Sequence, residues 1–315
     1  MMIKEYLLNK KTIFSFLISI VILYIIFSNV DFNLLLKTII NIRIEYYLIS
    51  FIIFYLSILI KSYRWKILLK NINTDISLKE SFLIYYLSMF VNSIVPAKLG
   101  DIYRGYLLKK ITNKSISLTV GTIFIERIFD LIAMLTILLI TGYISFFTKI
   151  PNIIMDAIKI GFIITLFLIF FSIIFIKYWR ILPYLGKKIE NIFINFEKGL
   201  RVVNFKSIPL LTFLSFLGWT LEGLSLVFVI KSLNLRYSIV YSIFTGLSSS
   251  LLTAVPFTPS GLGVVEGAMN YILRIGGYGS LESLSIVVLY RLISYFSIVI
   301  LGGVLFILLP KILKE

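Results

Sequence analysis

The sequence has no cysteine and no histidine. Without cysteine the chain can form no disulfide, no zinc–thiolate site and no thiol nucleophile. Without histidine, any proton chemistry near neutral pH must use carboxylates, lysines or tyrosines with shifted pKa values. The chain also lacks a Walker phosphate loop, a CxxC metal motif and a Gly-x-Ser-x-Gly elbow. These absences exclude a pump that is energised by its own nucleotide site, and we expect no metal and no cofactor.

Acidic residues are scarce as well, with 15 against 31 basic residues and a net charge of +16. Such an excess is typical of nucleic-acid-binding proteins, but here the basic residues flank apolar segments, as membrane topology demands. Hydrophobic residues make up 59% of the chain and the mean hydropathy is +1.00. A soluble domain cannot hide that much apolar surface. We therefore expect an all-α polytopic integral membrane protein, a single membrane domain over residues 1–315, with no nucleic-acid partner.

Several apolar segments are long enough to cross a bilayer, since a helix of about 20 residues spans the ~30 Å hydrocarbon core. Six qualify: residues 12–30, 44–60, 117–141, 157–176, 207–230 and 283–309. Two more, residues 81–95 and 238–255, are shorter or richer in serine, threonine and glycine. The sequence therefore predicts six to eight transmembrane helices.

Each of the two weaker segments runs into a polar element broken by glycine and proline. The first reads VPAKLGDIYR at residues 95–104, and the second reads VPFTPSGLGVVE at residues 255–266. In both cases an apolar helix follows that carries an arginine, Arg127 or Arg291, roughly 30 to 35 residues after the first proline. Twin helix breaks in two halves of a membrane protein indicate a transport site.

The basic loops favour one topology. If all eight segments crossed from a cytoplasmic N-terminus, the basic residues within 98–114 and 177–206 would lie outside, against the positive-inside rule. If residues 81–110 instead dip into the membrane and return, these loops lie inside together with the basic residues of 61–70. Residues 238–273 then dip from the outer side. We expect inverted repeats at about 12–142 and 157–309 in the cell membrane, with both termini cytoplasmic; eight plain spans are the main alternative.

The connector between the repeats, residues 178–206, carries apolar residues among its charges: Ile189, Ile192, Phe193 and Phe196. This pattern is typical of an amphipathic helix on the cytoplasmic surface. An ordinary solvated connector would also fit.

Three charges, Glu126, Arg127 and Asp130, lie near the middle of the third predicted span. Each costs roughly 2.5–3.5 kcal/mol at the centre of a membrane helix, so all three must face protein, water or a ligand. Glu126 and Asp130 share a helix face, and Arg127 can pair with Asp130. They form either a buried ion network that fixes helix packing or part of a substrate or ion site.

By its repeat position Arg291 is the counterpart of Arg127. A guanidinium holds a phosphate with two parallel hydrogen bonds and keeps its charge at membrane depth. The alternative for Arg291 is a structural pair with Glu266 or Glu222. We hypothesise that the two arginines hold a lipid phosphate alternately from the two leaflets.

The hairpin tips are broken at Pro96, Gly100, Pro259, Gly261 and Gly263. A half-helix that starts at such a break presents unpaired N–H groups and a positive dipole end, which suits an anion.

Acidic residues accompany these tips. Asp101 and Glu266 follow the breaks and either cap the new helices or serve as proton carriers or partners of a cationic head group. Glu222 is a lone acid in a span and another candidate proton site. At the end of the second span, Arg64-Trp65 is interpreted as an interfacial anchor.

Taken together, these motifs resemble those of the membrane region of lysylphosphatidylglycerol synthases and their stand-alone flippase-like relatives, over nearly the whole chain. The resemblance rests on Arg64-Trp65, Pro96…Gly100-Asp101…Arg104, Glu126-Arg127…Asp130, Pro256…Pro259-Ser260-Gly261-Leu262-Gly263…Glu266, and Arg291 with Tyr295. Two positions depart from the family pattern: Asp101 stands where glutamate is usual, and Ser260 where glycine is usual. The charge and the loop break are kept, but the Ser260 position is less flexible.

The resemblance implies translocation of lipids, either aminoacylated phospholipids or polyprenyl-phosphate-linked lipids. The implied substrate-binding residues are Arg104, Arg127, Arg291, Tyr295 and the tip residues Pro96, Gly100, Pro259, Gly261 and Gly263. Asp101, Glu126, Asp130, Glu222 and Glu266 would balance charge or carry protons. Partners would be membrane lipids with anionic head groups and a separate lipid-modifying enzyme. Since only residues 310–315 follow Leu309, we expect no synthase domain here and no enzyme activity.

Two other function classes stay open at this point. A membrane-embedded enzyme of lipid-linked substrates would need a carboxylate pair for acid–base work and a cytoplasmic donor site. An ion-coupled transporter of small solutes would need a closed central pocket, whereas a groove open sideways to lipid favours a flippase.

Overall fold

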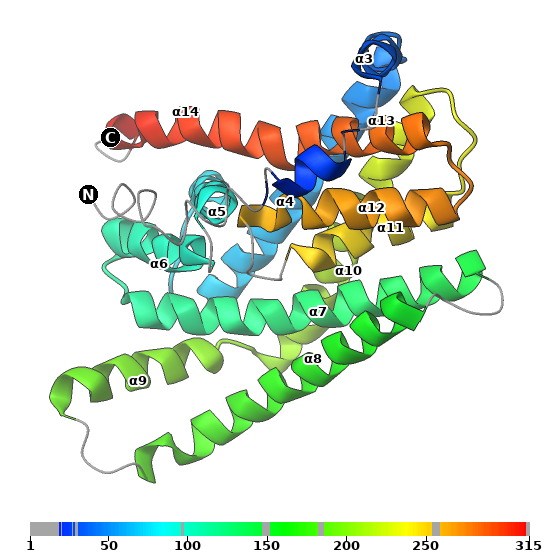
Figure 1. Ribbon diagram of the computed structural model, residues 1–315. Helices are drawn as coiled ribbons and strands as arrows, with labels where there is room; N and C mark the ends of the chain where they lie inside the picture. The colour runs from blue at the N-terminus through cyan, green and yellow to red at the C-terminus, as the bar shows by residue number, and fades with distance from the viewer. Residues whose placement is uncertain are drawn as a thin grey trace. The chain divides into compact units, whose positions relative to one another are not determined.

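The computed structural model describes residues 19, 21–26, 28, 31–95, 98–146, 152–181, 186–253 and 259–312. Over these residues all regular structure is helical, in twelve α-helices labelled α3 to α14 (Figure 1). The expected all-α fold is confirmed for this part of the chain. Pro96 lies outside the described residues, as do residues 254–258 of the second broken element and most of the first predicted span.

Four helical segments among the described residues are long and apolar enough to cross a membrane: Ile44–Lys70, Ile154–Ile181, Phe205–Ser232 and Ser280–Leu308. They contain or overlap the predicted spans 44–60, 157–176, 207–230 and 283–309. The predicted span 117–141 lies within α7 (Ile116–Phe146), whose 31 residues exceed the length that a crossing needs. Its three central charges set α7 apart from the four more apolar segments.

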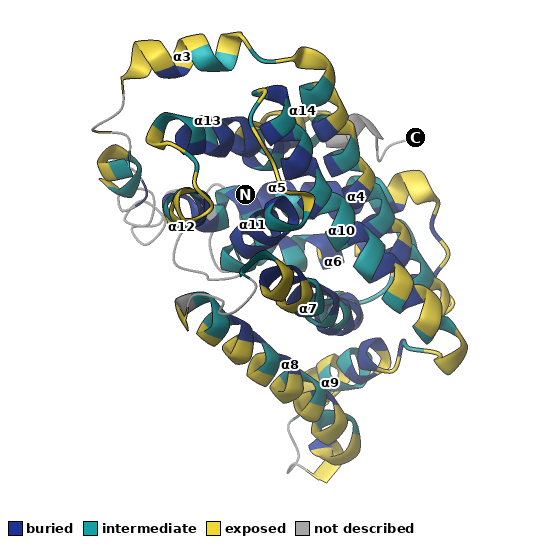
Figure 2. Ribbon diagram, turned by 90° about the vertical axis from the view of Figure 1, so that its right-hand side faces the viewer, coloured by how far each residue is buried: buried dark blue, intermediate teal, exposed yellow. Residues whose placement is uncertain are grey.

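One face of α8 (Asn152–Tyr178) is built for lipid contact (Figure 2). Ile163, Leu166, Phe167 and Phe170 recur at the spacing of a single helix face, and each is more than half exposed. A contiguous apolar stripe of this size is unfavourable in water and is satisfied by hydrocarbon chains.

The described helices of the two broken elements are short. α5 (Leu78–Ile94) has 17 residues and α6 (Leu99–Thr112) has 14. α11 (Ile239–Leu252) has 14 residues and α12 (Val264–Ile275) has 12. At 1.5 Å per residue these helices measure about 25, 21, 21 and 18 Å, all less than the ~30 Å core. None of them is long enough to cross the hydrocarbon core along a straight path.

The chain divides into two compact units. Unit 1 consists of Met1–Ser57, Met89–Gly100 and Thr220–Glu315, and unit 2 consists of Ile58–Ser88 and Asp101–Trp219. Each unit takes segments from both halves of the sequence, so the units are not the two proposed repeats. The repeats concern symmetry rather than compactness, and they stay a prediction.

In unit 2, α7 is flanked by α8 and by α9 (Lys187–Leu200) (Figure 1). α7 and α9 approach each other at Gly121 and Gly199. A Cβ atom on Gly121 would lie 2.5 Å from the carbonyl oxygen of Phe196 and 2.8 Å from Cα of Gly199. The rings of Phe193 and Phe196 pack edge-on against Phe175 of α8. The aromatic side of α9 therefore faces protein.

In unit 1, α3 (Phe32–Ile40) begins at Asp31, whose carboxylate accepts hydrogen bonds from the N–H groups of Asn33 and Leu34. α12 lies between α11 and α13 (Ser280–Arg291) (Figure 1). A π-helical turn at Leu292–Phe296 joins α13 to α14 (Ser297–Ile312). Such turns insert one extra residue per turn and re-aim the side chains beside them.

Candidate functional site

Arg64, on α4 (Ile44–Lys70), is the centre of a buried ion network in unit 2. Its Nη1 donates to Oδ1 of Asp130 at 2.8 Å and to Oγ of Ser215 at 2.6 Å, and its Nη2 donates to Oε1 of Glu126 at 3.0 Å. Arg64 and Glu126 are fully enclosed. One guanidinium thus bridges the two carboxylates that share a face of α7.

This geometry shows that the interpretation of Arg64-Trp65 as an interfacial anchor is wrong. Both side chains are fully buried, and Nε1 of Trp65 donates to Oγ1 of Thr122 at 3.3 Å. The physical reason is charge: Glu126 and Asp130 both need a cation, and Arg64 supplies it from a neighbouring helix.

Arg104, on α6, contacts the opposite oxygen of the same glutamate. Its Nη2 lies 2.9 Å from Oε2 of Glu126, and its guanidinium carbon lies 3.9 Å from the ring centre of Trp65 and 4.5 Å from that of Tyr85. Stacking on two aromatic faces favours a cation that has left water. Glu126 is therefore held between two arginines.

Asp130 has a further donor on α10 (Ile208–Ser232). Nε1 of Trp219 donates to Oδ1 of Asp130 at 2.8 Å, and Nζ of Lys61 lies 3.4 Å above the Trp219 ring. Within unit 2, side chains from α4, α7 and α10 thus converge on one carboxylate.

Arg127 has a different environment. Its Nη2 donates to both oxygens of Asp101, at 3.1 and 3.2 Å, whereas its Nη1 is 3.6 Å from Oδ2 of Asp130. The Arg127 side chain is 36% exposed and that of Asp101 is 19% exposed. Arg127 can pair with Asp130 as expected, but its closer partner is Asp101.

The three arginines of the network meet an equal number of carboxylates, and Lys61 is a further cation near Asp130. Arg64, Arg104 and Arg127 face Asp101, Glu126 and Asp130, three positive against three negative charges. A buried charge that loses its partner is strongly destabilising, so the enclosed members must stay together. The Arg127–Asp101 pair is exposed enough to exchange partners.

Unit 1 contains the counterpart arginine, and it is enclosed. Nε of Arg291 donates to Oε1 of Glu266 at 2.6 Å, and its Nη2 donates to the carbonyl oxygen of Ser260 at 3.4 Å. Both charged side chains are only 6% exposed. The guanidinium lies over the ring of Tyr295 at 4.9 Å, and the hydroxyl of Tyr295 donates to the carbonyl of Ser93. The pairing with Glu266 that the sequence left open is therefore present.

The second broken element uses backbone conformations that favour glycine. Gly261 and Gly263 have φ angles of +69° and +85°, and Ser260 has +47°. Oε2 of Glu266 accepts a hydrogen bond from the N–H of Gly263 at 2.6 Å. Glu266 therefore caps α12 with one oxygen and pairs with Arg291 through the other. Pro259 begins the turn that contains Ser260 and Gly261.

The first broken element is closed by Asn92, whose Oδ1 accepts a hydrogen bond from the N–H of Gly100 at 2.8 Å. The preceding residue but one, Lys98, has a positive φ of 56°. Glu222, the remaining candidate acid, accepts a hydrogen bond from Oγ of Ser250 at 2.6 Å. It links α10 to α11 within unit 1.

Comparison with known proteins identifies the family. The family described as the lysylphosphatidylglycerol synthase TM region matches residues 12–302. The chain belongs to this family. Together with the four candidate spans, this match shows a multi-pass membrane protein.

Relatives of the family occur in several archaea. The chain is 54% identical over 228 residues to the UPF0104 membrane protein MJ1078 of Methanocaldococcus jannaschii, which covers 72% of this chain and 97% of that protein. It is 24% identical over 327 residues to the UPF0104 membrane protein MJ1595 of the same organism, covering 96% of each. A UPF0104 membrane protein of Pyrococcus horikoshii is 23% identical over 306 residues, covering 88% of this chain and 91% of that protein.

The sequence did not predict that Arg64 bridges Glu126 and Asp130. It also did not predict that Lys61, Ser215 and Trp219 belong to the unit 2 network. A charge count held a signal for Arg64, because Glu126 and Asp130 together need more than the one positive charge that Arg127 offers. No comparable signal marks Trp219, since an indole in an apolar span usually packs without a charged partner.

Proposed function

We propose that this member of the lysylphosphatidylglycerol synthase TM family moves a phosphate-bearing lipid between the leaflets of the bilayer. The substrate would be an aminoacylated phospholipid or a polyprenyl-phosphate-linked lipid. The observation that carries this proposal is the partly exposed Arg127–Asp101 pair beside an enclosed ion network.

The depth of the pair supports the proposal. Arg127 lies 11 positions after Ile116, hence about 16 Å along a helix that is about 46 Å long in total. A fixed cation in the middle third of such a helix is costly unless it is functional or paired. A lipid phosphate that enters the hydrocarbon core is costly for the same reason unless a cation pairs with it.

The chemistry is an exchange of partners on Arg127. The phosphate replaces Asp101 and receives two parallel hydrogen bonds from the guanidinium. Asp101 is then available to the ammonium of an aminoacyl head group, or to water. Arg64 and Arg104 stay bound to Glu126, so α7, which carries Arg127, keeps its position during the exchange.

In unit 1, Arg291 would undergo the matching exchange in a second conformation. Here its pair with Glu266 is closed, and the phosphate would take the place of Glu266. Alternate opening of the two arginines would expose the site to one leaflet at a time. Glu266 and Glu222 would balance charge or carry protons in that cycle.

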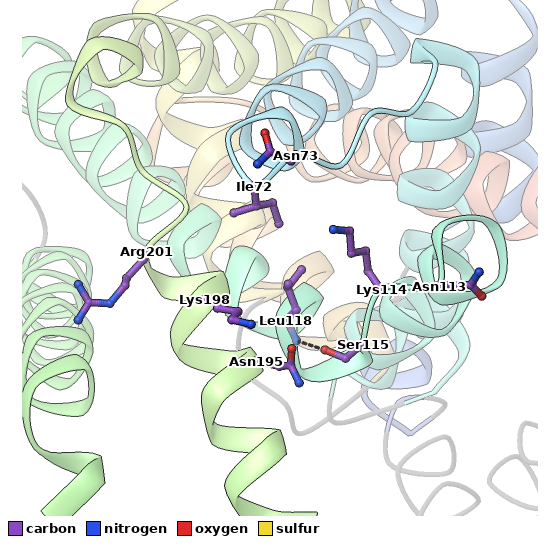
Figure 3. Close-up of a pocket in the computed structure, with 9 residues that line it drawn as sticks. All are labelled: Ile72, Asn73, Asn113, Lys114, Ser115, Leu118, Asn195, Lys198 and Arg201. Carbon is purple, nitrogen blue, oxygen red and sulfur yellow. Dashed lines mark hydrogen bonds between the residues drawn. The ribbon is translucent and has the colours of Figure 1, made fainter.

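The proposed re-entrant hairpins are supported by the nearness of the two ends of each hairpin. In unit 2, Asn73 before α5 and Asn113 after α6 line the same cavity (Figure 3). In unit 1, the hydroxyl of Tyr278 after α12 donates to the carbonyl of Arg236 before α11, at 2.9 Å. A hairpin whose two ends meet starts and finishes on the same face of the membrane. Broken backbone at membrane depth is tolerated where it lines such a site.

Reconstituted vesicles test this function. Purified protein is inserted into liposomes that contain a fluorescent phospholipid, and the fraction that reaches the other leaflet is followed by quenching from outside. Loss of a charge-assisted, two-point contact costs about 1.5–3 kcal/mol, so Arg127→Ala should slow transfer at least about tenfold. Arg291→Ala should do the same. The control is Arg274→Ala, which removes one positive charge from the last turn of α12, outside the site.

Two results would overturn the proposal. One is full-rate transfer by Arg127→Ala and Arg291→Ala proteins whose thermal unfolding matches that of the wild type. The other is chemical conversion of a labelled lipid donor by the purified protein, which would favour a membrane-embedded enzyme. Arg127→Lys separates charge from geometry, because lysine keeps the charge but cannot form the paired hydrogen bonds.

A further inference from the structure

A cavity of about 620 Å³ lies within unit 2, apart from the ion network. Its walls come from three places: the residues after α4, the connection between α6 and α7, and the last turns of α9 (Figure 3). The cavity is within the size range of pockets that hold small ligands. Leu118, in its wall, precedes Glu126 by eight positions, which places it about 12 Å away along α7.

The charge of the cavity is positive. Lys114, Lys198 and Arg201 are among its nine lining residues, and none of the nine is acidic. In Figure 3 the ammonium groups of Lys114 and Lys198 face the cavity from different walls, whereas the guanidinium of Arg201 points away. Arg201 is bound to Glu197, with Nε 2.8 Å from Oε1. The cavity therefore holds two positive charges that no lining carboxylate offsets.

Neutral polar residues accompany the two lysines. Asn73 and Asn195 also line the cavity, and Nδ2 of Asn195 donates to the carbonyl oxygen of Asn191 at 2.8 Å. Ser115 contributes a hydroxyl, which also accepts the N–H of Leu118 at 3.2 Å and so caps the start of α7. Two ammonium groups among amides and a hydroxyl are typical of a site that receives oxyanions.

Helix dipoles alone do not account for these lysines. The C-terminal ends of α4, α6 and α9 each contribute about −0.5 charge and the N-terminal end of α7 about +0.5, a sum near −1. The two lysines contribute +2. A net charge of about +1 is left in the cavity, which one phosphodiester would neutralise.

We propose that this cavity binds a phosphate group, carried either by the head group of an anionic lipid or by a soluble phosphate ester. The site uses none of the residues assigned to lipid transfer, so it stands independently of the proposed function. The topology expected from the basic segments would put it at the cytoplasmic face, where head groups of the inner leaflet and soluble phosphates are both within reach.

Titration calorimetry on the purified full chain tests the site. The probes are inorganic phosphate, glycerol phosphate and dihexanoyl phosphatidylglycerol below its micelle concentration. We expect Lys114→Gln/Lys198→Gln to weaken binding at least about tenfold, because two charge-assisted contacts are lost. The matched control, Lys187→Gln/Lys188→Gln, removes the same charge from the exposed first turn of α9 and should stay within about twofold.

The probes also separate the two sources of phosphate. Much tighter binding of the lipid assigns a lipid head group, and equal binding of all three probes assigns the phosphate group itself. A second variant, Asn195→Phe, should block binding by filling the cavity while leaving every charge in place. The proposal is overturned when no probe binds, or when the two double-lysine variants weaken binding equally, since diffuse attraction to a basic surface would then suffice.

Discussion

Ser260 lies in the left-handed region of backbone conformation, with a φ of +47°. An L-residue with a Cβ atom pays roughly 1–2 kcal/mol there, whereas glycine adopts it freely. The hydroxyl of Ser260 gains only a long contact of 3.3 Å with that of Ser93. The positive φ therefore gives a physical reason why glycine is usual at this position in the family that the sequence resembles.

Replacement of Ser260 by glycine should stabilise the protein by about 1 kcal/mol, because the backbone strain is relieved and little bonding is lost. Thermal unfolding in detergent measures the effect as a rise in Tm. A contrasting variant is Ser250→Gly inside α11, which should lower Tm, because glycine costs about 1 kcal/mol in a helix and the hydrogen bond from Ser250 to Glu222 is lost. An unchanged or lower Tm for Ser260→Gly would show that the backbone at Ser260 is not strained.

Glu197, a buried carboxylate on α9, gives a second residue-level prediction. Burial acts to raise the pKa of its carboxyl, but hydrogen bonds from Trp179 and Arg201 and the charges of Arg180 and Arg201 lower it by more, so the pKa falls below the ordinary 4.5. A carboxyl whose pKa is lower in the folded state stabilises the fold above its unfolded pKa and loses that contribution as pH falls through the folded value.

Wild type should therefore exceed Glu197→Gln in Tm at neutral pH, and the gap should close as the pH falls below about 4.5. Differential scanning fluorimetry over a pH series would show this. A gap that stays constant into strong acid would mean that ionisation of Glu197 does not stabilise α9.

The residue scale is also where sequence reasoning was least complete. Glu126, Arg127 and Asp130 were predicted as charges that must face protein, water or a ligand, and the structure gives each of them an ion-pair partner; their depth in the membrane stays a prediction. The partners of those charges on α4 and α10 were not predicted. Pairing across helices depends on which faces meet, and a hydrophobic run carries no information about that.

Among the elements, the contact of α7 with α9 depends on two glycines. Gly121 and Gly199 let the backbones approach so closely that a Cβ atom on Gly121 would lie 2.5 Å from the Phe196 carbonyl oxygen. Backbone atoms cannot move aside as a flexible side chain can. The aromatic packing of α9 against α8 depends on the same approach.

Gly121→Ala should accordingly destabilise the protein by about 1–3 kcal/mol, the usual cost of overpacking. Gly267→Ala in α12 is the matched control: its Cβ would meet only Ile26, at an ordinary 3.5 Å, so the variant should be neutral or stabilising. Chemical unfolding of the two variants gives the comparison. Equal stability would show that α7 and α9 are not in close contact.

The positions of the helices were easier to predict from the sequence than the contacts between them. Long apolar runs gave four of the spans, because burial in lipid demands length and composition alone. The short helices at the two breaks were marked by proline and glycine. The π-helical turn at Leu292–Phe296 was not expected, since no residue there is a helix breaker and tertiary packing decides such a turn.

In the whole molecule, the distribution of basic residues along the chain predicts which segments lie on the cytoplasmic side of the membrane. The net charge is +16, and of the two topologies weighed only the re-entrant one brings the basic segments 61–70, 109–114 and 177–206 to one face, although Lys61 and Arg64 lie buried within α4. The cavity of unit 2 has lining residues from the second and third of these regions and from Ile72 and Asn73, just after the first, which agrees with that arrangement. Repeats of opposite orientation remain the central claim, because they place an arginine site in each half.

Site-directed cysteine labelling tests the opposite orientation of the repeats. The chain has no native cysteine that would react with the thiol reagent. Single cysteines replace four exposed residues of unit 2, Asp75, Lys109, Lys187 and Asp156, and a membrane-impermeant thiol reagent is applied to sealed vesicles of known orientation. With a re-entrant first hairpin, positions 75, 109 and 187 react from the cytoplasmic face and position 156 reacts from the opposite face. Labelling of positions 75 and 109 from opposite faces would contradict it, because the first hairpin would then cross the bilayer.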